Sequence, residues 1–223
     1  MMLSTSLYSQ KEASNLKNDL GFNLNAILNK VIFNKTNDEI TNPFPDQVSV
    51  LTYRHFVSPK VAIRLGLGFD QFSRNDSTFS IFSGPLIEED KFRFYAVHFG
   101  IQKNIVDAKK VKLTLGWDWF FRRETQDKTR NDLFVGGGIN FLESVSTDVY
   151  KETNLGFGIP IGIQYYFNDC ILISTEFSLE IFQTSSKNKL VYNNSFNEEY
   201  RDNPDVVNIK FRPPLALFIH YRF

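Results

Sequence analysis

The sequence predicts an all-β fold, an eight-stranded antiparallel up-and-down transmembrane β-barrel. About eight segments alternate apolar and polar residues with period 2, the pattern of a strand with one apolar and one polar face. The connections between these segments are alternately short and long. The last segment, 207–223, alternates over a longer run than a typical soluble strand. A strand that crosses a bilayer at a tilt needs about 9–11 residues, so this run is long enough to span one.

The composition favours this fold over other classes. The chain has 223 residues, enough for one sizeable domain. Aromatic residues make up 15% of it, with 23 phenylalanines, as suits a lipid-facing surface with aromatic girdles. A mean hydropathy of −0.25, with no apolar run of about 20 residues, excludes a helical membrane protein. The formal net charge of +0 gives no basic footprint for nucleic acid, and the single cysteine, Cys170, excludes a disulfide within the chain.

The start of the chain differs from the rest. Residues 1–10 read as a signal-peptide remnant or a disordered N-terminus, because they lack a basic start and a full apolar region of about 7–15 residues. The remaining residues, 11–223, form a single barrel domain. Since that domain requires export, we expect the true start to lie upstream and the mature chain to begin near Gln10 or Lys11.

The expected elements follow from the alternation and from the turn-forming residues. Strands are predicted near residues 20–32, 47–57, 61–72, 92–105, 111–123, 154–167, 171–184 and 207–223. Short turns are expected at 58–60, 106–110 and 168–170, and long polar loops at 34–46, 74–91, 124–153 and 185–206.

Two segments need a separate interpretation. Leu133–Leu142 reads as part of a strand or hairpin above the membrane, because a ninth spanning strand would put the C-terminus on the wrong side. In the last strand, Pro213 and Pro214 cannot donate to a ladder, so a local break is expected there, at a bulge or above the membrane. Residues 215–223 would then be the fully paired span, and this strand must pair with the first one to remove both edges.

The two faces of the strands differ in chemistry. A charge at mid-bilayer costs about 2–4 kcal/mol, so the face that carries charges and glycines is expected to line the lumen. A narrow eight-stranded lumen must pair its charges, which predicts a closed lumen without an open pore. The predicted lumen charge network consists of Arg54, Arg64, Lys112, Asp118, Glu176, Glu180, Lys210 and Arg212, and His220 shares their face. The predicted membrane-interface aromatics are Tyr53, Trp117, Trp119, Tyr165, Phe167, Tyr221 and Phe223.

No catalytic site, metal site or cofactor is predicted. Glu176 and Glu180 share a face and fit an internal ion-pair network better than acid–base chemistry. One alternative remains a lipid-modifying barrel enzyme that uses His55 or His98 with a nearby serine. Another is a soluble calycin-like ligand-binding barrel, which would have an apolar cavity and a charged exterior.

A family resemblance adds to this interpretation. It rests on the hairpin Tyr53–Lys60, the alternation Gly66-Leu67-Gly68 and the terminal Tyr221-Arg222-Phe223. From about Leu20 the chain resembles the small outer-membrane β-barrel family, OmpA- or OmpX-like in architecture and similar to the PorT-like barrel proteins of Bacteroidota.

The resemblance implies a compartment and partners. It implies a bacterial outer-membrane location with short periplasmic turns and long extracellular loops. The expected partners are outer-membrane lipid, the barrel-assembly machinery that reads the C-terminal strand, and protein or ligand contacts of the loops, without nucleic acid. The implied function is non-enzymatic, through the extracellular loops or in envelope assembly or integrity.

Overall fold

The computed structural model describes residues 17–24, 50–80, 84–135, 141–192, 198–213 and 217–223. Within these ranges the chain forms ten strands: β1 Asn18–Asn23, β2 Leu51–Ser58, β3 Val61–Ser80, β4 Gly84–Asp107, β5 Val111–Val135, β6 Phe141–Tyr166, β7 Ile171–Tyr192, β8 Glu198–Asp202, β9 Val206–Arg212 and β10 Leu217–Arg222. No helix in the described part of the chain is long and apolar enough to cross a membrane.

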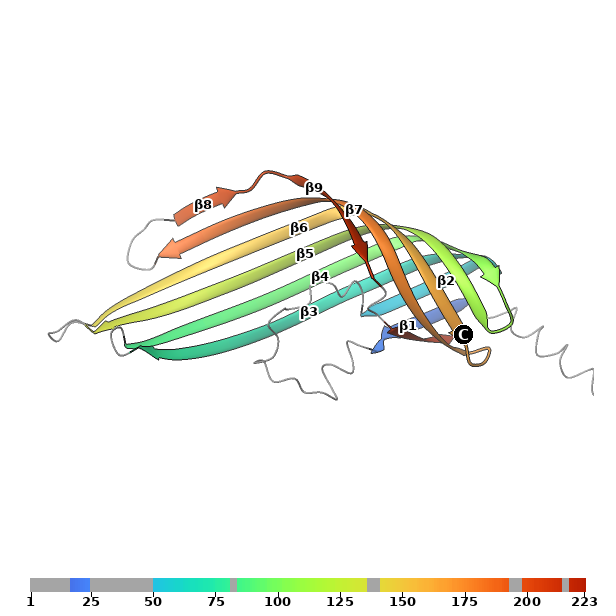
Figure 1. Ribbon diagram of the computed structural model, residues 1–223, viewed down its shortest axis with the longest axis horizontal. Helices are drawn as coiled ribbons and strands as arrows, with labels where there is room; N and C mark the ends of the chain where they lie inside the picture. Colours follow the sequence, from blue (N-terminus) through green and yellow to red (C-terminus); the bar gives the residue numbers. More distant parts are fainter. Residues whose placement is uncertain (1–16, 25–49, 81–83, 136–140, 193–197, 214–216) are drawn as a thin grey trace, which may run out of the picture.

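Eight of these strands close into a ring (Figure 1). Strands β1 to β7 pair antiparallel with their neighbours in chain order, and β10 pairs with both β1 and β7. Tyr221 of β10 lies opposite Leu20 on one side and Ile171 on the other, so both edges of the C-terminal strand are paired. This ring confirms the predicted eight-stranded antiparallel barrel and the predicted pairing of the last strand with the first.

The predicted last strand is divided into β9 and β10; Pro213 lies outside both, and Pro214 with residues 215–216 lies outside the described residues. Arg212 ends β9 opposite Ser178, whereas Leu217 begins β10 opposite Thr175. Four residues therefore lie between β9 and β10 where two lie on β7, which is a two-residue insertion. Because side chains alternate with period 2, an even insertion keeps Arg212 and His220 on the same buried face. The break is a bulge at the height of Glu176 and Phe177 rather than a feature above the apolar surface.

The prediction of long polar loops is wrong for most of the residues that the structure describes in them, although residues 203–205 are not in a strand. The ladder between β3 and β4 continues to Ser80 opposite Gly84, and that between β5 and β6 to Val135 opposite Phe141. The stretches 74–91, 124–153 and 185–206 are therefore largely strand, and the predicted outer ends of five strands are too short. Both faces of these extensions meet water, so the apolar alternation that marks a membrane strand is absent from them.

Other boundaries agree better. The turn ends of β3 to β7 fall within two residues of the predictions, and turns lie at 59–60, 108–110 and 167–170. Leu133–Val135 ends β5 and Phe141–Leu142 begins β6, at the tip of a projecting hairpin. The first strand begins at Asn18, two residues before its predicted start. The predictions for 1–10, 25–32, 34–46 and 47–49 lie outside the described residues.

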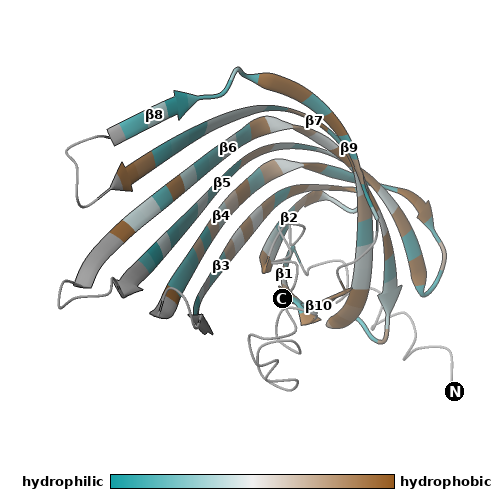
Figure 2. Cartoon of the chain, turned by 60° about the vertical axis from the view of Figure 1, so that its left-hand side comes forward, coloured by the Kyte–Doolittle hydropathy of each residue, from teal (hydrophilic) through white to brown (hydrophobic). Residues whose placement is uncertain are grey.

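The molecule has two regions. The ring occupies the end with the short turns, and the longer parts of β3 to β7 project from it as one curved, open sheet extended by β8 (Figures 1 and 2). The hydropathy colouring shows brown over much of the ring strands and mostly teal to white in the projecting sheet, apart from brown at the free end of β7 (Figure 2). On β3 the pairing with β2 ends at Leu67, so the rest of this strand has a partner only in β4 among the described residues.

Candidate functional site

The inward side chains of the ring fill its lumen in layers along the barrel axis. At the turn end, Arg222 lies between two aromatic rings, 4.9 Å from the centroid of Phe56 and 5.0 Å from that of Tyr166. It also donates to the Tyr166 hydroxyl at 2.8 Å. Lys112 lies over the same Tyr166 ring and 3.1 Å from the carboxylate of Asp107. These cation–π and polar contacts fill the turn end with side chains.

The second layer joins the first and last strands. The Arg54 Nε donates to Asp19 Oδ1 at 2.7 Å, and Arg54 Nη2 lies 2.9 Å from His220 Nδ1. On the other side of the imidazole, Nε2 lies 2.8 Å from the Ser174 hydroxyl. Gly21 makes room for this layer, since a Cβ there would collide with the His220 ring.

Ser174, His220 and Asp19 are the residue types of a hydrolase triad, but here the imidazole proton lies on the nitrogen opposite to the one that a triad requires. A guanidinium can only donate, so the contact of Arg54 with Nδ1 requires a lone pair on that nitrogen. The ring proton then lies on Nε2 and is donated to the Ser174 hydroxyl. A general base needs a free Nε2 to accept the serine proton, so this arrangement does not activate the serine. Ser174 and His220 are each only 2% exposed, in the lumen.

The next two layers are charge networks. Arg64 binds both oxygens of Glu176, at 3.2 and 2.7 Å, and lies 3.3 Å from Asp118. Above it, Glu180 receives Arg122 at 2.6 and 2.7 Å and Arg212 at 2.6 Å.

The charges of the second to fourth layers balance. The four acidic side chains are Asp19, Asp118, Glu176 and Glu180, and the four arginines are Arg54, Arg64, Arg122 and Arg212. Charge pairing and hydrogen bonding of this kind are what burial of ions requires. Six of the eight residues predicted for the lumen network therefore lie in these layers, while Lys112 lies at the turn end and Lys210 is half-buried opposite Glu180.

The sequence interpretation missed several lumen residues. Asp19, Arg122 and Arg222 were not assigned to the network, and His220 was placed on its face without a contact. Each is in phase with the lumen positions of its own strand, as Arg122 is with Asp118. If the alternation of inward and outward positions is extended to the end of each strand, it predicts that all four of these residues face the lumen. The contact between Ser174 and His220 has no signal in the sequence, because 46 residues separate the two.

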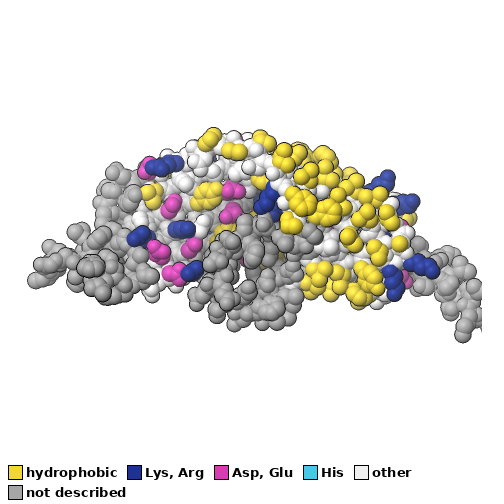
Figure 3. Space-filling view, in the orientation of Figure 1, with side chains coloured by type: hydrophobic (Ala, Val, Ile, Leu, Met, Phe, Trp, Pro, Cys, Tyr) yellow, Lys and Arg dark blue, Asp and Glu magenta, His cyan; other side chains and the backbone are white. Residues whose placement is uncertain are grey.

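The outward side chains of the ring form an apolar belt. On four adjoining strands it spans eleven residues, from Ile105 to Tyr95 on β4 and correspondingly on the next three strands. The other limits are Val111 to Phe121, Tyr165 to Leu155 and Ile171 to Ile181. The space-filling view shows this apolar surface over the ring, with charged side chains beyond it in the projecting sheet and at the turn end (Figure 3).

The predicted interface aromatics lie on this belt at different heights. Tyr165 packs edge-on against Phe167 with centroids 5.2 Å apart, and Tyr221 stacks on Phe223 at 6.2 Å, both at the turn end. Tyr53, near the same end, donates to Asn18 at 2.8 Å. The two tryptophans, Trp117 and Trp119, lie six and eight residues above Val111, in the upper half of the belt.

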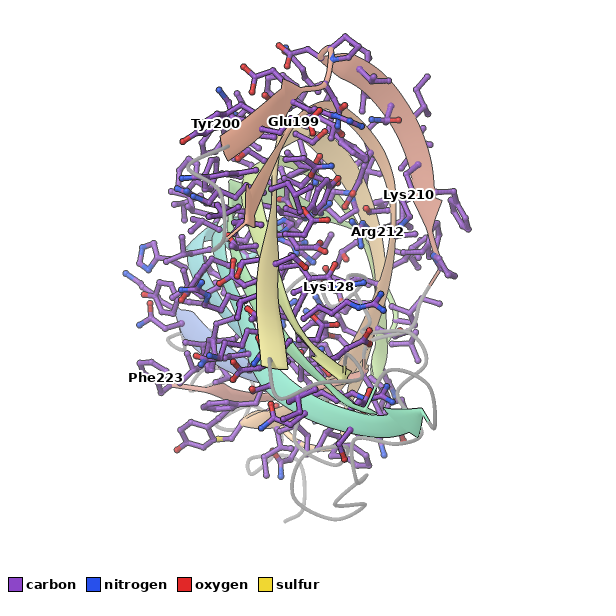
Figure 4. The ribbon with its side chains drawn as sticks, turned by 90° about the vertical axis from the view of Figure 1, so that its left-hand side faces the viewer. Lys128, Glu199, Tyr200, Lys210, Arg212 and Phe223 are labelled. Carbon is purple, nitrogen blue, oxygen red and sulfur yellow. The ribbon has the colours of Figure 1, made fainter. Side chains whose placement is uncertain are left out.

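Above the belt, the concave wall of the projecting sheet is polar. Lys128 points into its hollow, Arg212 of the lumen layer below points to the same side, and Phe223 lies outside at the far end (Figure 4). Glu124 lies opposite Glu152 across β5 and β6. Burial and then the neighbouring Glu152 charge raise the pKa of Glu124 from an ordinary value of 4.5 to about 7.

Glu152 is held by two donors. Tyr150 donates to one of its oxygens at 2.6 Å and Asn154 to the other at 2.7 Å. Desolvation and this hydrogen bond raise the pKa of Tyr150 to about 12. In the described ranges no group of three or more His, Cys, Asp and Glu side chains is placed to hold a metal ion.

The fold and the lumen together define the class: an eight-stranded β-barrel with an apolar exterior and a closed, charge-paired interior. No family model and no curated protein matches the chain. Among solved structures, it is similar to CarO2 of Acinetobacter baumannii, with a TM-score of 0.42 and 8% identity over 93% of this chain and 98% of that one. A likeness of that size supports no conclusion on activity, so the function is inferred from the chain's own geometry.

Proposed function

We propose that the chain is a non-enzymatic bacterial outer-membrane β-barrel with a closed lumen, which acts through the sheet that it projects from the membrane. The observation that carries this proposal is the apolar belt. The ten steps from the first to the last residue of the belt on a strand rise about 34 Å along the strand, and at a tilt of about 40° this becomes about 25 Å along the barrel axis. That height matches the apolar band of outer-membrane barrels.

The exposure of the belt favours lipid over water. Trp117 is 57% exposed and Ile209 73% exposed, and they belong to one continuous outer surface. Soluble proteins rarely expose a contiguous apolar patch of more than a few hundred Å². A calycin-like soluble barrel would place its apolar residues inside, so the charged lumen disfavours that alternative.

The closed lumen predicts the absence of a steady pore. An eight-stranded ring leaves an interior just wide enough for side chains, and here arginine–carboxylate layers and an aromatic layer occupy it. In planar-bilayer recordings we expect no large, steady conductance. Such a conductance would contradict the closed lumen, whereas small flickering currents are compatible with it.

A lipid-modifying enzyme is the second candidate, because Ser174 and His220 lie 2.8 Å apart. The reversed proton of the imidazole and the burial of both residues disfavour it. A fluorophosphonate probe is therefore expected not to label the folded barrel. Labelling that Ser174→Ala abolishes would support the enzyme instead.

The projecting sheet supplies the surface that the chain presents outside the membrane. Its strands are paired to their tips and carry polar side chains on both faces, which suits a surface that contacts partners or stabilises the envelope outside the membrane. We further propose that Phe223 and the rest of the C-terminal strand are read by the barrel-assembly machinery.

Fractionation tests the proposal as a whole. The chain, exported behind a signal peptide, is expected in the outer-membrane fraction with a heat-modifiable gel band. Recovery from the soluble fraction without that band would contradict the proposal.

A further inference from the structure

Four basic residues form a band on the outer face of the projecting sheet, directly above the apolar belt. This basic band consists of Arg93 on β4, Arg123 on β5, Lys151 on β6 and Lys187 on β7. In the ladder, Lys151 lies between Thr125 and Lys187, and Arg93 lies on the far side of Thr125. Arg123 lies between Tyr95 and Thr153, one step closer to the belt.

The cross-strand contacts within the sheet do not neutralise all the charges of the basic band. Lys151 and Lys187 face each other directly, and like charges in that position are destabilising. Asp127 pairs with Arg93, and Asp202 lies 3.5 Å from Lys187. Arg123 and Lys151 make no ion pair with any residue that the structure describes.

Charge is also separated across the thickness of the sheet. Among the side chains that the structure describes on the outer face of β4 to β8 beyond the belt, six are basic and three are acidic: Lys91, Arg93, Arg123, Lys151, Lys187 and Lys189 against Glu89, Asp127 and Asp202. The described side chains on the inner wall of the same strands show the opposite excess: Glu88, Asp90, Glu124, Asp148, Glu152 and Glu199 against Lys128, Arg130 and Arg201. The excess of positive charge is therefore on the convex side, the side that continues the lipid-facing surface.

We propose that the basic band binds the phosphate groups of phosphorylated lipid headgroups in the outer leaflet. The inference rests on the proposed function, because it needs the belt to lie in that membrane. Arg123 lies two residues beyond Phe121 of the belt, about 7 Å along the strand, which is headgroup height for a lipid whose acyl chains lie on Trp119 and Phe157.

The chemistry of the band suits phosphate. Arginine presents a planar set of donors that matches phosphate oxygens, and lysine adds a point charge. The hydroxyl groups of Thr125, Thr153 and Ser185 lie on the same face between the basic residues and supply further donors. A phosphate over Lys151 and Lys187 also relieves the repulsion between these two ammonium groups.

The test compares two glycolipids with identical acyl chains, one bisphosphorylated and one dephosphorylated. The full chain is refolded in a zwitterionic detergent, and binding of each glycolipid is measured by native mass spectrometry. The test variant is the double substitution Arg123→Gln, Lys151→Gln. The control is Lys109→Gln, Lys110→Gln, which removes the same charge from the exposed turn between β4 and β5, at the opposite end of the barrel.

We expect the wild-type chain and the control to prefer the bisphosphorylated glycolipid. The double variant should lose about 30-fold in affinity for it, since each basic residue near a charged lipid surface contributes about a factor of five. The single variant Lys187→Gln should show a smaller loss in the same direction. All variants should keep the heat-modifiable band, because these side chains are exposed or half-exposed and lie outside the ring.

The failures can be told apart. Equal binding of the two glycolipids by the folded wild-type chain overturns the lipid site alone, and so does an equal loss in the control. Displacement of the bisphosphorylated glycolipid by millimolar inorganic phosphate makes the band a free-phosphate site and also overturns it. A wild-type chain without a heat-modifiable band contradicts the proposed function itself.

Discussion

The ring and the projecting sheet are made of the same strands, yet they are stabilised differently. In the ring, one face is the exposed apolar belt and the other is buried in the charged lumen, so exposure alternates along each strand. In the projecting sheet both faces meet water, and the strands are joined by their ladders and by cross-strand pairs such as Gln126 with Asp90. Strand pairing is thus common to both regions, whereas strict alternation of apolar and polar residues occurs only where the two faces of a strand have different surroundings.

The largest expected effect on folding comes from a deletion in β10, the strand that closes the ring, compared with a substitution in the projecting sheet. Deletion of Tyr221–Phe223 removes the last paired positions of β10, Tyr221 and Arg222 opposite β1 and Tyr221 opposite β7, and each backbone group left unpaired in lipid costs several kcal/mol. We expect loss of the heat-modifiable band. Leu190→Ala, in the projecting part of β7, should leave it unchanged. A shifted, folded band from the truncated chain in outer membranes would refute the role of this strand.

A buried charge should matter more in the ring than an exposed one in the sheet. Glu180→Ala leaves Arg122 and Arg212 without their carboxylate, and breaking such a buried pair costs about 3–5 kcal/mol. Glu199→Ala, which removes the exposed partner of Arg201, should cost about 0–1 kcal/mol. Urea unfolding in lipid vesicles measures both. Equal losses would mean that the lumen network adds no stability beyond surface pairs.

Packing gives a third, smaller contrast within the ring. A Cβ on Gly100 would collide with the backbone oxygen of Trp117, so Gly100→Ala is expected to cost about 1–3 kcal/mol. At Gly158 the nearest atom to an added Cβ is Glu180 Cγ at 3.5 Å, an ordinary contact. Gly158→Ala should therefore be nearly neutral in the same unfolding assay. The reverse order would show that the lumen relaxes around Gly100.

The smallest effect concerns pH and the projecting sheet. The pKa of Glu124 is raised from 4.5 to about 7, so the folded sheet binds this proton more tightly than the unfolded chain does. The resulting stabilisation is full below pH 4.5 and is lost as the pH rises through about 7. The protection factors of the amides in the outer parts of β5 and β6, which compare exchange with the intrinsic base-catalysed rate, should fall over that range.

Glu124→Gln should remove this pH dependence and leave exchange in the ring unchanged. Thr125→Ser, the neighbouring position on the opposite face, serves as the control and should retain the pH dependence. A pH dependence that survives in Glu124→Gln would assign it to another group.

The sequence predicts the ring well because the ring has two different surroundings. The alternation around Gly156 and Phe157 gives the strand, its face and its height on the barrel. It predicts the projecting sheet poorly, since residues such as Lys128, Thr129 and Arg130 are polar on both faces and read as a loop. Their pairing depends on long-range ladders with β4 and β6, which local composition does not encode.

The lumen lies between these cases. That Arg64 and Glu176 face inward follows from phase alone, but that they meet depends on the register of β3 relative to β7, two strands that are not neighbours. The same holds for Arg54 and His220, 166 residues apart. Membership of the lumen is thus a local property of each strand, and the choice of ion-pair partner is a property of the closed ring.

The two-residue bulge between Arg212 and Leu217 constrains how the gene can change. A single-residue insertion or deletion here would turn Lys210 and Arg212 toward lipid and Phe211 toward the lumen, while β10 kept its place. A pair of inserted or deleted residues would leave both faces intact. Related sequences should therefore differ in length at this bulge only by even numbers, which makes the parity of gaps a marker of the closed ring that needs no similarity in sequence.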